Sequence, residues 1–299
     1  CGDTPLLKGE TIKGLMTRHR HSGASATMLT AVISDSKGYG RIIRGLNGNP
    51  VAIREEKDAT ADEKKILEVN TGVYCFKADS LFKALDEVKE NHRKKEFYLT
   101  DVIEIMADHG WKLEALEMAD PQESLGVNSK VDLATAERVI RYRILEKLMI
   151  DGVTIVDPQT TYIDAQVKIG RNTMIRPFTV IERDVVIGKD CVIGPFAHLR
   201  PQAQIGDRTE IGNFAEVSRS KFSSDCFMKH FSFVGDAVVG KGSNIGAGVV
   251  TANYDGKNKN PSRIGDGAFI GSDAILVAPV DIGKGAVVGA GCVVAKEKK

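Results

Sequence analysis

The second half of the chain has an apolar residue at every sixth position, and the longest uninterrupted run comprises Ile163, Ile169, Ile175, Ile181, Ile187, Ile193, Leu199, Ile205, Ile211 and Val217. Four residues after most of these positions stands a small or slim side chain, such as Thr173 or Ala197. A six-residue period fits neither an amphipathic helix, which repeats about every 3.6 residues, nor a simple alternating strand. It predicts a parallel β-helix, in which three hexads form one triangular coil with the apolar residues pointing inward.

The period shortens by one residue at two places and is interrupted at a third. It resumes at Phe222, Met228 and Val234, then at Val239, Ile245 and Thr251, and finally from Ile264 to Val294. Glycine often follows the apolar residue, which suits corners where a Cβ would clash or φ must be positive. The interruption, T-A-N-Y-D-G-K-N-K-N-P-S-R, is polar and rich in turn-forming residues. We expect it to form an external loop, and insertions of this kind on a solenoid commonly carry function.

Before about residue 151 the six-residue period is absent, and the pattern favours an α/β layer. Residues 27–33 and 72–76 have strand character, whereas residues 80–88 and 100–107 have helical spacing. Residues 132–150 contain little Gly or Pro and have apolar positions at helical spacing, which predicts a long linker helix. The expected domains are therefore 1–130 for part of an α/β domain, 131–150 for the linker helix and 151–299 for the β-helix.

Composition restricts the partners more than the fold. Lys plus Arg number 41 and Asp plus Glu 40, so the net charge of +1 gives no general attraction to nucleic acid or to an anionic membrane. No apolar run approaches the roughly 20 residues of a membrane span, and we expect a soluble, cytoplasmic protein without a secretory leader. The five cysteines are odd in number and lack a C-x-x-C pair, which favours neither a disulfide framework nor a zinc cluster.

Six short motifs precede the hexads in a fixed order. They are C-G-D-T-P-L-L at 1–7, G-Y-G-R-I at 38–42, E-E-K-D-A-T at 55–60, V-N-T-G at 69–72, E-F-Y-L-T-D at 96–101 and G-V-N at 126–128. With the hexads and the N-Y-D-G sequence at 253–256, they resemble the GlmU family of bifunctional N-acetylglucosamine-1-phosphate uridyltransferases and glucosamine-1-phosphate acetyltransferases. The resemblance covers nearly the whole chain. It implies a partial Rossmann-like nucleotidyltransferase domain, a left-handed parallel β-helix of hexapeptide repeats, and a place in UDP-N-acetylglucosamine biosynthesis.

In the first domain the resemblance implies uridyl transfer from UTP to N-acetylglucosamine 1-phosphate. It assigns one Mg²⁺ to Asp3 and Asn128, whose oxygen atoms are hard ligands that suit this ion. The family's sugar-binding positions fall on Gly40, Glu55, Asn70, Tyr98 and Thr100. Taken singly, these residues also fit tight turns and a helix cap, and only the ordered set favours the functional interpretation. The chain begins at Cys1, so we expect the family's Gly-rich phosphate loop and uracil pocket to be missing and uridyl transfer to need them.

In the β-helix the resemblance implies acetyl transfer from acetyl-CoA to glucosamine 1-phosphate. His230 is the implied general base, because an imidazole accepts a proton near neutral pH, and Glu216 supports it. The other implied positions are Asn253 and Tyr254 near the reacting groups, Asn244 on the sugar, Arg200 and Lys259 on the phosphate, and Ala247, Ser272 and Ala290 on acetyl-CoA. Without the family, Arg200, Glu216 and Lys259 also fit a solvated outer face, and His230 fits a surface histidine.

Two substitutions depart from the family pattern. Ser218, followed by Arg219, stands where the family usually has a phosphate-binding Lys, and Phe233 stands where it has a sugar-contacting Tyr. Loss of one charged hydrogen bond removes about 1.5–3 kcal/mol, or about one to two decades of affinity. We expect weaker substrate binding, with the chemistry retained. The chain also ends at Lys299 without the family's C-terminal arm, which predicts lower affinity for acetyl-CoA.

Three other functions fit parts of the pattern. A hexapeptide carbonic anhydrase needs three histidines around zinc, whereas only His198 and His230 lie in the repeats. A catalytically silent trimeric scaffold fits a stable stack whose ends lack functional parts. A nucleotidyl-sugar transferase without acetyl transfer is not expected to retain Glu216, His230 and the Asn253–Tyr254 pair together. We expect a homotrimer, because the flat faces of a triangular prism pack side by side and the loop of one chain can complete a neighbour's site.

Overall fold

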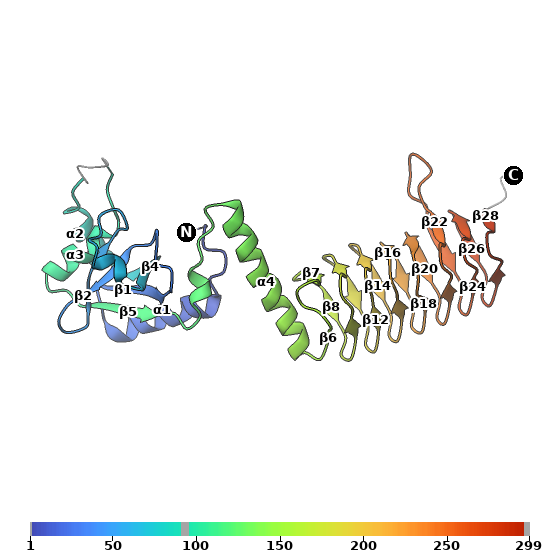
Figure 1. Cartoon of the computed structure of the whole chain (residues 1–299), viewed down its shortest axis with the longest axis horizontal. Helices are drawn as coiled ribbons and strands as arrows, with labels where there is room; N and C mark the ends of the chain where they lie inside the picture. Colours follow the sequence, from blue (N-terminus) through green and yellow to red (C-terminus); the bar gives the residue numbers. More distant parts are fainter. Residues whose placement is uncertain (1, 91–95, 296–299) are drawn as a thin grey trace. The chain divides into compact units, whose positions relative to one another are not determined.

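A computed structural model describes residues 2–90 and 96–295. The chain divides into two compact units, Cys1–Val139 and Ile140–Lys299, and Figure 1 shows an α/β arrangement in the first and a stack of coils in the second. None of the described helices is long and apolar enough to cross a membrane.

The first unit contains a five-stranded sheet of order β3-β2-β4-β1-β5. Its elements are α1 (Gly9–Ser22), β1 (Ala26–Val32), β2 (Arg41–Arg44), β3 (Pro50–Arg54), η1 (Glu63–Lys65), β4 (Glu68–Phe76), α2 (Ala78–Leu85), α3 (Asp101–Asp108), β5 (Leu113–Glu117) and η2 (Pro121–Ser124). Strand β1 runs antiparallel to β4 and parallel to β5. The two strands and two helices expected from the pattern are present, with ends shifted by a few residues.

Helices cover both faces of this sheet. Successive residues of β1 point to opposite faces, so Met28 joins a core cluster with residues of α2 and α3, whereas Leu29 joins a second cluster with Leu15 of α1. Residues 26–31 are accordingly all buried. A strand that is buried on both sides reads as a continuous apolar run, and this confirms the expected α/β layer.

The predicted linker helix is α4, which spans Lys130–Ile150. It begins at a reciprocal capping arrangement, in which Asp132 Oδ2 accepts a hydrogen bond from the Ser129 N–H at 2.9 Å and the Asp132 N–H donates to Ser129 Oγ at 3.2 Å. Towards its other end, Leu145 is fully buried in the core of the second unit. The helix therefore starts two residues earlier than the pattern predicted, because the cap lies at Ser129.

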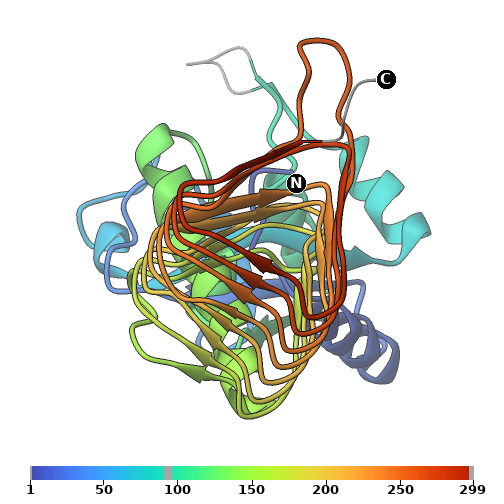
Figure 2. The ribbon, with the colours of Figure 1, turned by 90° about the vertical axis from the view of Figure 1, so that its right-hand side faces the viewer.

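The second unit is a left-handed parallel β-helix whose three sheets form the sides of a prism, seen end-on in Figure 2. Sheet I contains β7 (Tyr162–Ile163), β10 (Val180–Ile181), β13 (His198–Leu199), β16 (Ala215–Ser218), β19 (Ser232–Gly235), β22 (Val250–Ala252), β25 (Ile275–Val277) and β28 (Val293–Ala295). Sheet II contains β8 (Lys168–Ile169), β11 (Val186–Ile187), β14 (Gln204–Ile205), β17 (Lys221–Phe222), β20 (Ala237–Val239), β23 (Ser262–Ile264) and β26 (Val280–Ile282). Sheet III contains β6 (Thr154–Ile155), β9 (Met174–Ile175), β12 (Val192–Ile193), β15 (Glu210–Ile211), β18 (Phe227–Met228), β21 (Asn244–Ile245), β24 (Phe269–Ile270) and β27 (Val287–Val288). Each strand pairs with the equivalent strand of the next coil, which confirms the fold predicted from the hexads.

At the corner between sheets II and III, the slim position of the hexad joins neighbouring coils through its side chain. Thr173 Oγ1 donates to the Gly188 carbonyl at 2.8 Å, and the Cys191 thiol donates to the Gly206 carbonyl at 3.2 Å. Burial raises the pKa of the Cys191 thiol, so the group stays protonated and remains a donor. The four described cysteines are free, as the sequence indicated.

The corner glycines have a narrower role than the sequence suggested. At Gly206, an added Cβ would lie 2.6 Å from the carbonyl carbon of Ser223 in the next coil, while the φ angle itself is not in the left-handed region. The left-handed residue comes two positions later and is often not glycine, as at Arg208 with a φ of 55°. At Gly206 glycine therefore follows the apolar residue because successive coils approach closely there, whereas at Gly194 the φ angle is positive, at 91°.

The interruption after β22 forms an external loop, as predicted, and Figure 1 shows it projecting from the stack beside β22. A single antiparallel bridge between Tyr254 and Lys259 closes it. The carboxylate of Asp255 accepts hydrogen bonds from the backbone of Lys257 and Asn258 at 2.8 and 2.7 Å. The loop is thus held by its own polar contacts.

Candidate functional site

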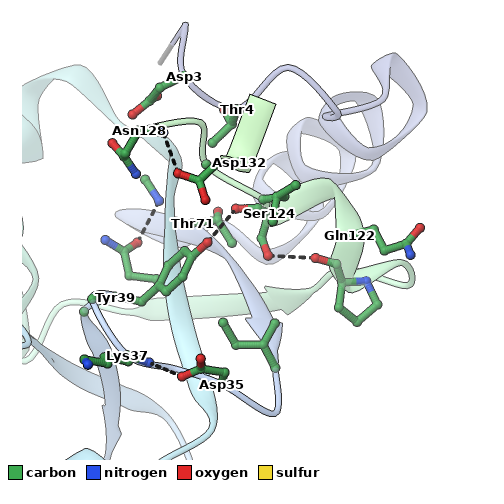
Figure 3. A pocket seen from close by; sticks show the side chains of 18 of the residues that line it. Asp3, Thr4, Asp35, Lys37, Tyr39, Thr71, Gln122, Ser124, Asn128 and Asp132 are labelled. Atoms are coloured by element: carbon green, nitrogen blue, oxygen red, sulfur yellow. Dashed lines mark hydrogen bonds between the residues drawn. The ribbon is translucent and has the colours of Figure 1, made fainter. Parts of the chain in front are cut away.

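The first unit contains a cavity of about 670 Å³ at the carboxyl end of β1 and beside β4 (Figure 3). Asp3, Gly40, Asn70 and Asn128 all line it. The segment before α1 and the segment before α4 meet at this cavity, because the Val127 N–H donates to the Asp3 carbonyl at 2.7 Å. Four motifs that are far apart in the sequence therefore meet at one cavity.

Asp3 and Asn128, the implied Mg²⁺ ligands, lie side by side at one end of this cavity in Figure 3. The nearby carboxylate of Asp132 is occupied by the N–H groups of Asn128 and Ser129, at 3.1 and 2.9 Å. Within residues 2–90 and 96–295 no group of three or more His, Cys, Asp or Glu side chains forms a metal site. One carboxylate and one amide, completed by water and substrate phosphate, nevertheless fit the ligand requirements of Mg²⁺.

Four of the five implied sugar-binding residues lie together. A Cβ at Gly40 would approach Glu55 Oε1 to 3.5 Å, and the Asn70 N–H donates to the Gly40 carbonyl at 2.8 Å. Thr100 Oγ1 in turn donates to Glu55 Oε1 at 3.0 Å. The fifth residue, Tyr98, is two residues before Thr100, in the turn that leads into α3. The sugar contacts of all five residues stay predictions.

Tyr74 also belongs to this group, although the sequence did not single it out. Its hydroxyl donates to Asn70 Oδ1 at 2.8 Å, and burial raises the pKa of Tyr74 to about 12, so it is a donor throughout the ordinary pH range. Asn70 and Tyr74 are four residues apart on β4 and therefore face the same side of the sheet. That alternation is the signal that could have identified Tyr74.

Arg41 supports the loop that carries Gly40. Its side chain is only 2% exposed, its Nη2 lies 2.8 Å from Glu56 Oε2, and its Nη1 donates to the Tyr39 carbonyl. The same carboxylate of Glu56 accepts from the Gly38 N–H at 3.2 Å, and the bond from Arg41 holds the pKa of Glu56 below its usual value. One buried guanidinium thus holds residues 38 and 39 in place, directly through the Tyr39 carbonyl and indirectly through Glu56.

In the second unit, His230 lies at the corner between sheets III and I. Strand pairing places Phe227 beside Asn244, Ile245 beside Ile270, and Ile270 beside Val288. In this register the residues two positions after the inward apolar residue, in four successive coils, are His230, Ala247, Ser272 and Ala290. The structure therefore aligns the implied base and all three implied acetyl-CoA positions in one column along one edge.

The ring of His230 is exposed, and it makes no hydrogen bond or ion pair to any residue of the described ranges. Asn244 stands on the outer face of sheet III, next to the same edge. Glu216 is in sheet I, where its Oε1 accepts from Arg200 Nη1 at 3.0 Å. The structure thus pairs Glu216 with Arg200, and support of His230 by Glu216 stays a prediction.

At the corner between sheets I and II lies Asp236, which the sequence did not identify and which contacts Arg219 and the implied residue Asn253. Asp236 accepts two bonds from Arg219, at 2.7 and 2.9 Å, and one from Asn253 Nδ2 at 2.5 Å. The Arg219 hydrogen bond is the main cause that lowers the pKa of Asp236, and the charge of Lys259 acts in the same direction. Tyr254, in contrast, donates within its own loop, to the Gly256 carbonyl at 2.7 Å.

The two substituted positions occupy sheet I. Ser218 is buried at the end of β16, and its hydroxyl oxygen accepts from Arg219 Nη1 at 2.8 Å. Phe233 lies in β19 between Glu216 and Val250 of the neighbouring coils. The small Ser218 side chain thus stands directly beside a guanidinium.

A hexapeptide β-helix that follows an α/β unit with a polar cavity is the arrangement of a hexapeptide-repeat protein with a second domain. The family model described as "Bacterial transferase hexapeptide (six repeats)" matches residues 184–219 and 261–296. The "Bifunctional protein GlmU" of Geobacillus sp. (strain WCH70) is 46% identical over 324 residues, covering 97% of this chain and 71% of that protein. That of Pelotomaculum thermopropionicum is 45% identical over 316 residues, covering 94% and 69%. The chain therefore belongs to the GlmU family.

Proposed function

We propose that the second unit transfers the acetyl group of acetyl-CoA to the amine of glucosamine 1-phosphate, a step of UDP-N-acetylglucosamine biosynthesis. The observation that carries this proposal is the column formed by His230, Ala247, Ser272 and Ala290. It brings an exposed imidazole into line with the three positions that family resemblance gives to acetyl-CoA. Membership of the GlmU family supports the same assignment.

In the proposed reaction His230 takes a proton from the sugar amine as the nitrogen attacks the thioester carbonyl. The new C–N bond forms, the C–S bond breaks, and the proton passes to the departing CoA sulfur. Oxygen becomes negatively charged in the tetrahedral intermediate, and the N–H of Ala247 has no backbone acceptor in the described residues. A free N–H next to the reacting carbonyl would stabilise that charge, an effect worth on the order of 10²–10³ in rate.

Release of free CoA thiol with glucosamine 1-phosphate and acetyl-CoA tests this function, with the N-acetylated sugar identified by mass. We expect the unaltered chain to release CoA and His230→Ala to lose most of that activity. Release no greater than that of His230→Ala would favour the alternative of a catalytically silent scaffold. Unchanged unfolding of His230→Ala in urea is the control, because the side chain is exposed.

For the first unit we propose the sugar- and metal-binding half of a uridyltransferase site, acting on N-acetylglucosamine 1-phosphate with UTP. Asp3 and Asn128 would hold Mg²⁺, which when bound neutralises phosphate charge. Gly40, Glu55 and Asn70 would bind the sugar. Calorimetry with N-acetylglucosamine 1-phosphate, with and without Mg²⁺, tests this: we expect Mg²⁺-dependent binding that Asp3→Asn removes, and binding indifferent to Mg²⁺ would contradict it.

We further propose that the chain is a homotrimer. Phe178, Phe196 and Phe214 occupy one corner in successive coils, with centroids 4.8 and 4.9 Å apart, and remain 52%, 44% and 61% exposed. This aromatic ridge follows the same edge as His230. An exposed apolar ridge along a straight edge supports packing against a second copy, whose loop would then approach the site.

A further inference from the structure

Asp236 joins two residues that reach it from different coils. Its Oδ1 and Oδ2 accept from Arg219 Nε and Nη2, and Oδ2 also accepts from Asn253 Nδ2. The three residues occupy the corner between sheets I and II in consecutive coils, and the Asp236 side chain is only 18% exposed. A carboxylate that receives three bonds fixes the orientation of both partners.

The guanidinium of Arg219 keeps part of its binding capacity. One bond from each of Nε, Nη2 and Nη1 is used, the last on Ser218 Oγ at 2.8 Å. A guanidinium has five N–H donors in a fixed fork, so two remain without a partner in the described residues. The side chain is 31% exposed. Arg219 is thus oriented by the protein yet still able to bind an anion.

The surrounding charges favour an anion at this corner. Arg200 lies one coil before Ser218, because its N–H donates to the Val217 carbonyl at 2.8 Å. Lys259 is close enough for its charge to lower the pKa of Asp236. The cations Arg200, Arg219 and Lys259 face two carboxylates, Glu216 and Asp236, which leaves one excess positive charge. A planar guanidinium fork matches the oxygen atoms of phosphate.

We propose that Arg219 binds the phosphate of the acetyl acceptor and that Asp236 is a positioning residue, which holds Arg219 and Asn253 in a fixed relation. The inference rests on the proposed acetyl transfer. It gives Ser218 a physical role, because a small hydroxyl leaves room for the guanidinium and accepts a bond from it. The positive charge expected at position 218 is then supplied by the next residue.

Comparison of two acceptors, glucosamine 1-phosphate and glucosamine, distinguishes a loss of phosphate binding from a general loss of structure or activity. We expect Arg219→Ala and Asp236→Asn to lower kcat/KM for glucosamine 1-phosphate about 10- to 100-fold, mainly through KM, as for loss of a charged hydrogen bond. For Arg219→Ala, the rate with glucosamine and the KM for acetyl-CoA should change little. Equal losses of Arg219→Ala with both acceptors would overturn the proposal, because they would indicate a structural role.

The double variant tests positioning. If Asp236 acts through Arg219, Asp236→Asn should add little to the KM effect of Arg219→Ala. Multiplicative losses in the double variant would show that Asp236 acts independently and would overturn its assignment. Arg219→Lys keeps the charge but loses the fork, so we expect it to recover only part of the affinity.

Arg208 offers a matched control. It makes the same two-bond contact with Asp225, at 2.6 and 3.0 Å, also at a corner and with positive φ, but between sheets II and III. Arg208→Ala should leave the preference for the phosphorylated acceptor unchanged. A similar loss in Arg208→Ala would mean that any surface arginine contributes, which contradicts a specific site.

Binding of inorganic phosphate, measured by calorimetry on the full chain, distinguishes failure of this inference from failure of the acetyl-transfer proposal. We expect the unaltered chain and Arg208→Ala to bind phosphate and Arg219→Ala to bind at least about tenfold more weakly. If no CoA is released but this difference remains, acetyl transfer fails and the anion site stands. If CoA is released and phosphate binding is equal in all variants, the anion site fails.

Discussion

Phe196 stacks on Phe178 of the preceding coil with ring centroids 4.8 Å apart and ring planes within 5° of parallel. Because both rings remain about half exposed, the contact between them buries only part of their apolar surface. We expect Phe196→Asp to weaken the proposed trimer while leaving the coil intact. Light scattering should then show a shift to lower mass, without a change in circular dichroism.

A matched control for that experiment is Val186→Asp, which places the same charge at an exposed position on sheet II, away from the aromatic ridge. It should keep the mass of the unaltered chain. A Phe196→Asp variant of unchanged mass would show that the ridge does not hold the copies together.

Replacement of His230 by Gln should lower kcat for acetyl transfer about 10²- to 10⁴-fold, because glutamine has a similar length but cannot accept the proton. The KM for glucosamine 1-phosphate should change little. Steady-state kinetics of CoA release provide the measurement. A drop in substrate affinity at constant kcat would instead make His230 a binding residue.

The Arg219–Asp236 pair predicts a pH-dependent contribution to stability. Arg219 lowers the pKa of Asp236, so the stabilisation is fully present above the ordinary aspartate value and is lost as the pH falls through the lowered one. Partial exposure limits it to about 1 kcal/mol. Urea unfolding should therefore show a lower free energy of unfolding for Arg219→Ala at pH 7, and a smaller difference near pH 3. A difference that is the same at both pH values would exclude this ion pair as its source.

Much of the fold follows from local patterns. The hexads predict the β-helix because the inward position of each hexad, such as Ile193, can be read from the local sequence of one coil. Helix α1 and strands β2, β3 and β5 were not predicted. In α1 the apolar residues Ile12, Leu15 and Met16 cover only about one turn, so the apolar stripe is too short to predict the helix.

The sites are less local than the fold. The sequence assigned His230 and Ala247 only through the family resemblance, and the structure brings them to equivalent positions across the shortened hexad between Val234 and Val239. It missed Asp236 because one shortened hexad, between Val217 and Phe222, brings Arg219 and Asp236 to the same corner 17 residues apart instead of 18. Such a contact depends on the three-dimensional register of two coils, which composition and spacing do not specify.

Gly206 provides a test of how closely the coils pack. In Gly206→Ala the new Cβ would lie 2.6 Å from a backbone carbon of the next coil, which cannot move without disturbing the hydrogen-bonded stack. We expect a cost of about 1–3 kcal/mol from overpacking. The measurement is urea unfolding followed by circular dichroism. The comparison is Gly242→Ala, where φ is 70° and no atom lies within 4 Å of the added Cβ, so only backbone strain of about 1 kcal/mol is expected. A Gly206→Ala variant as stable as the unaltered chain would show that the coils can separate there at little cost.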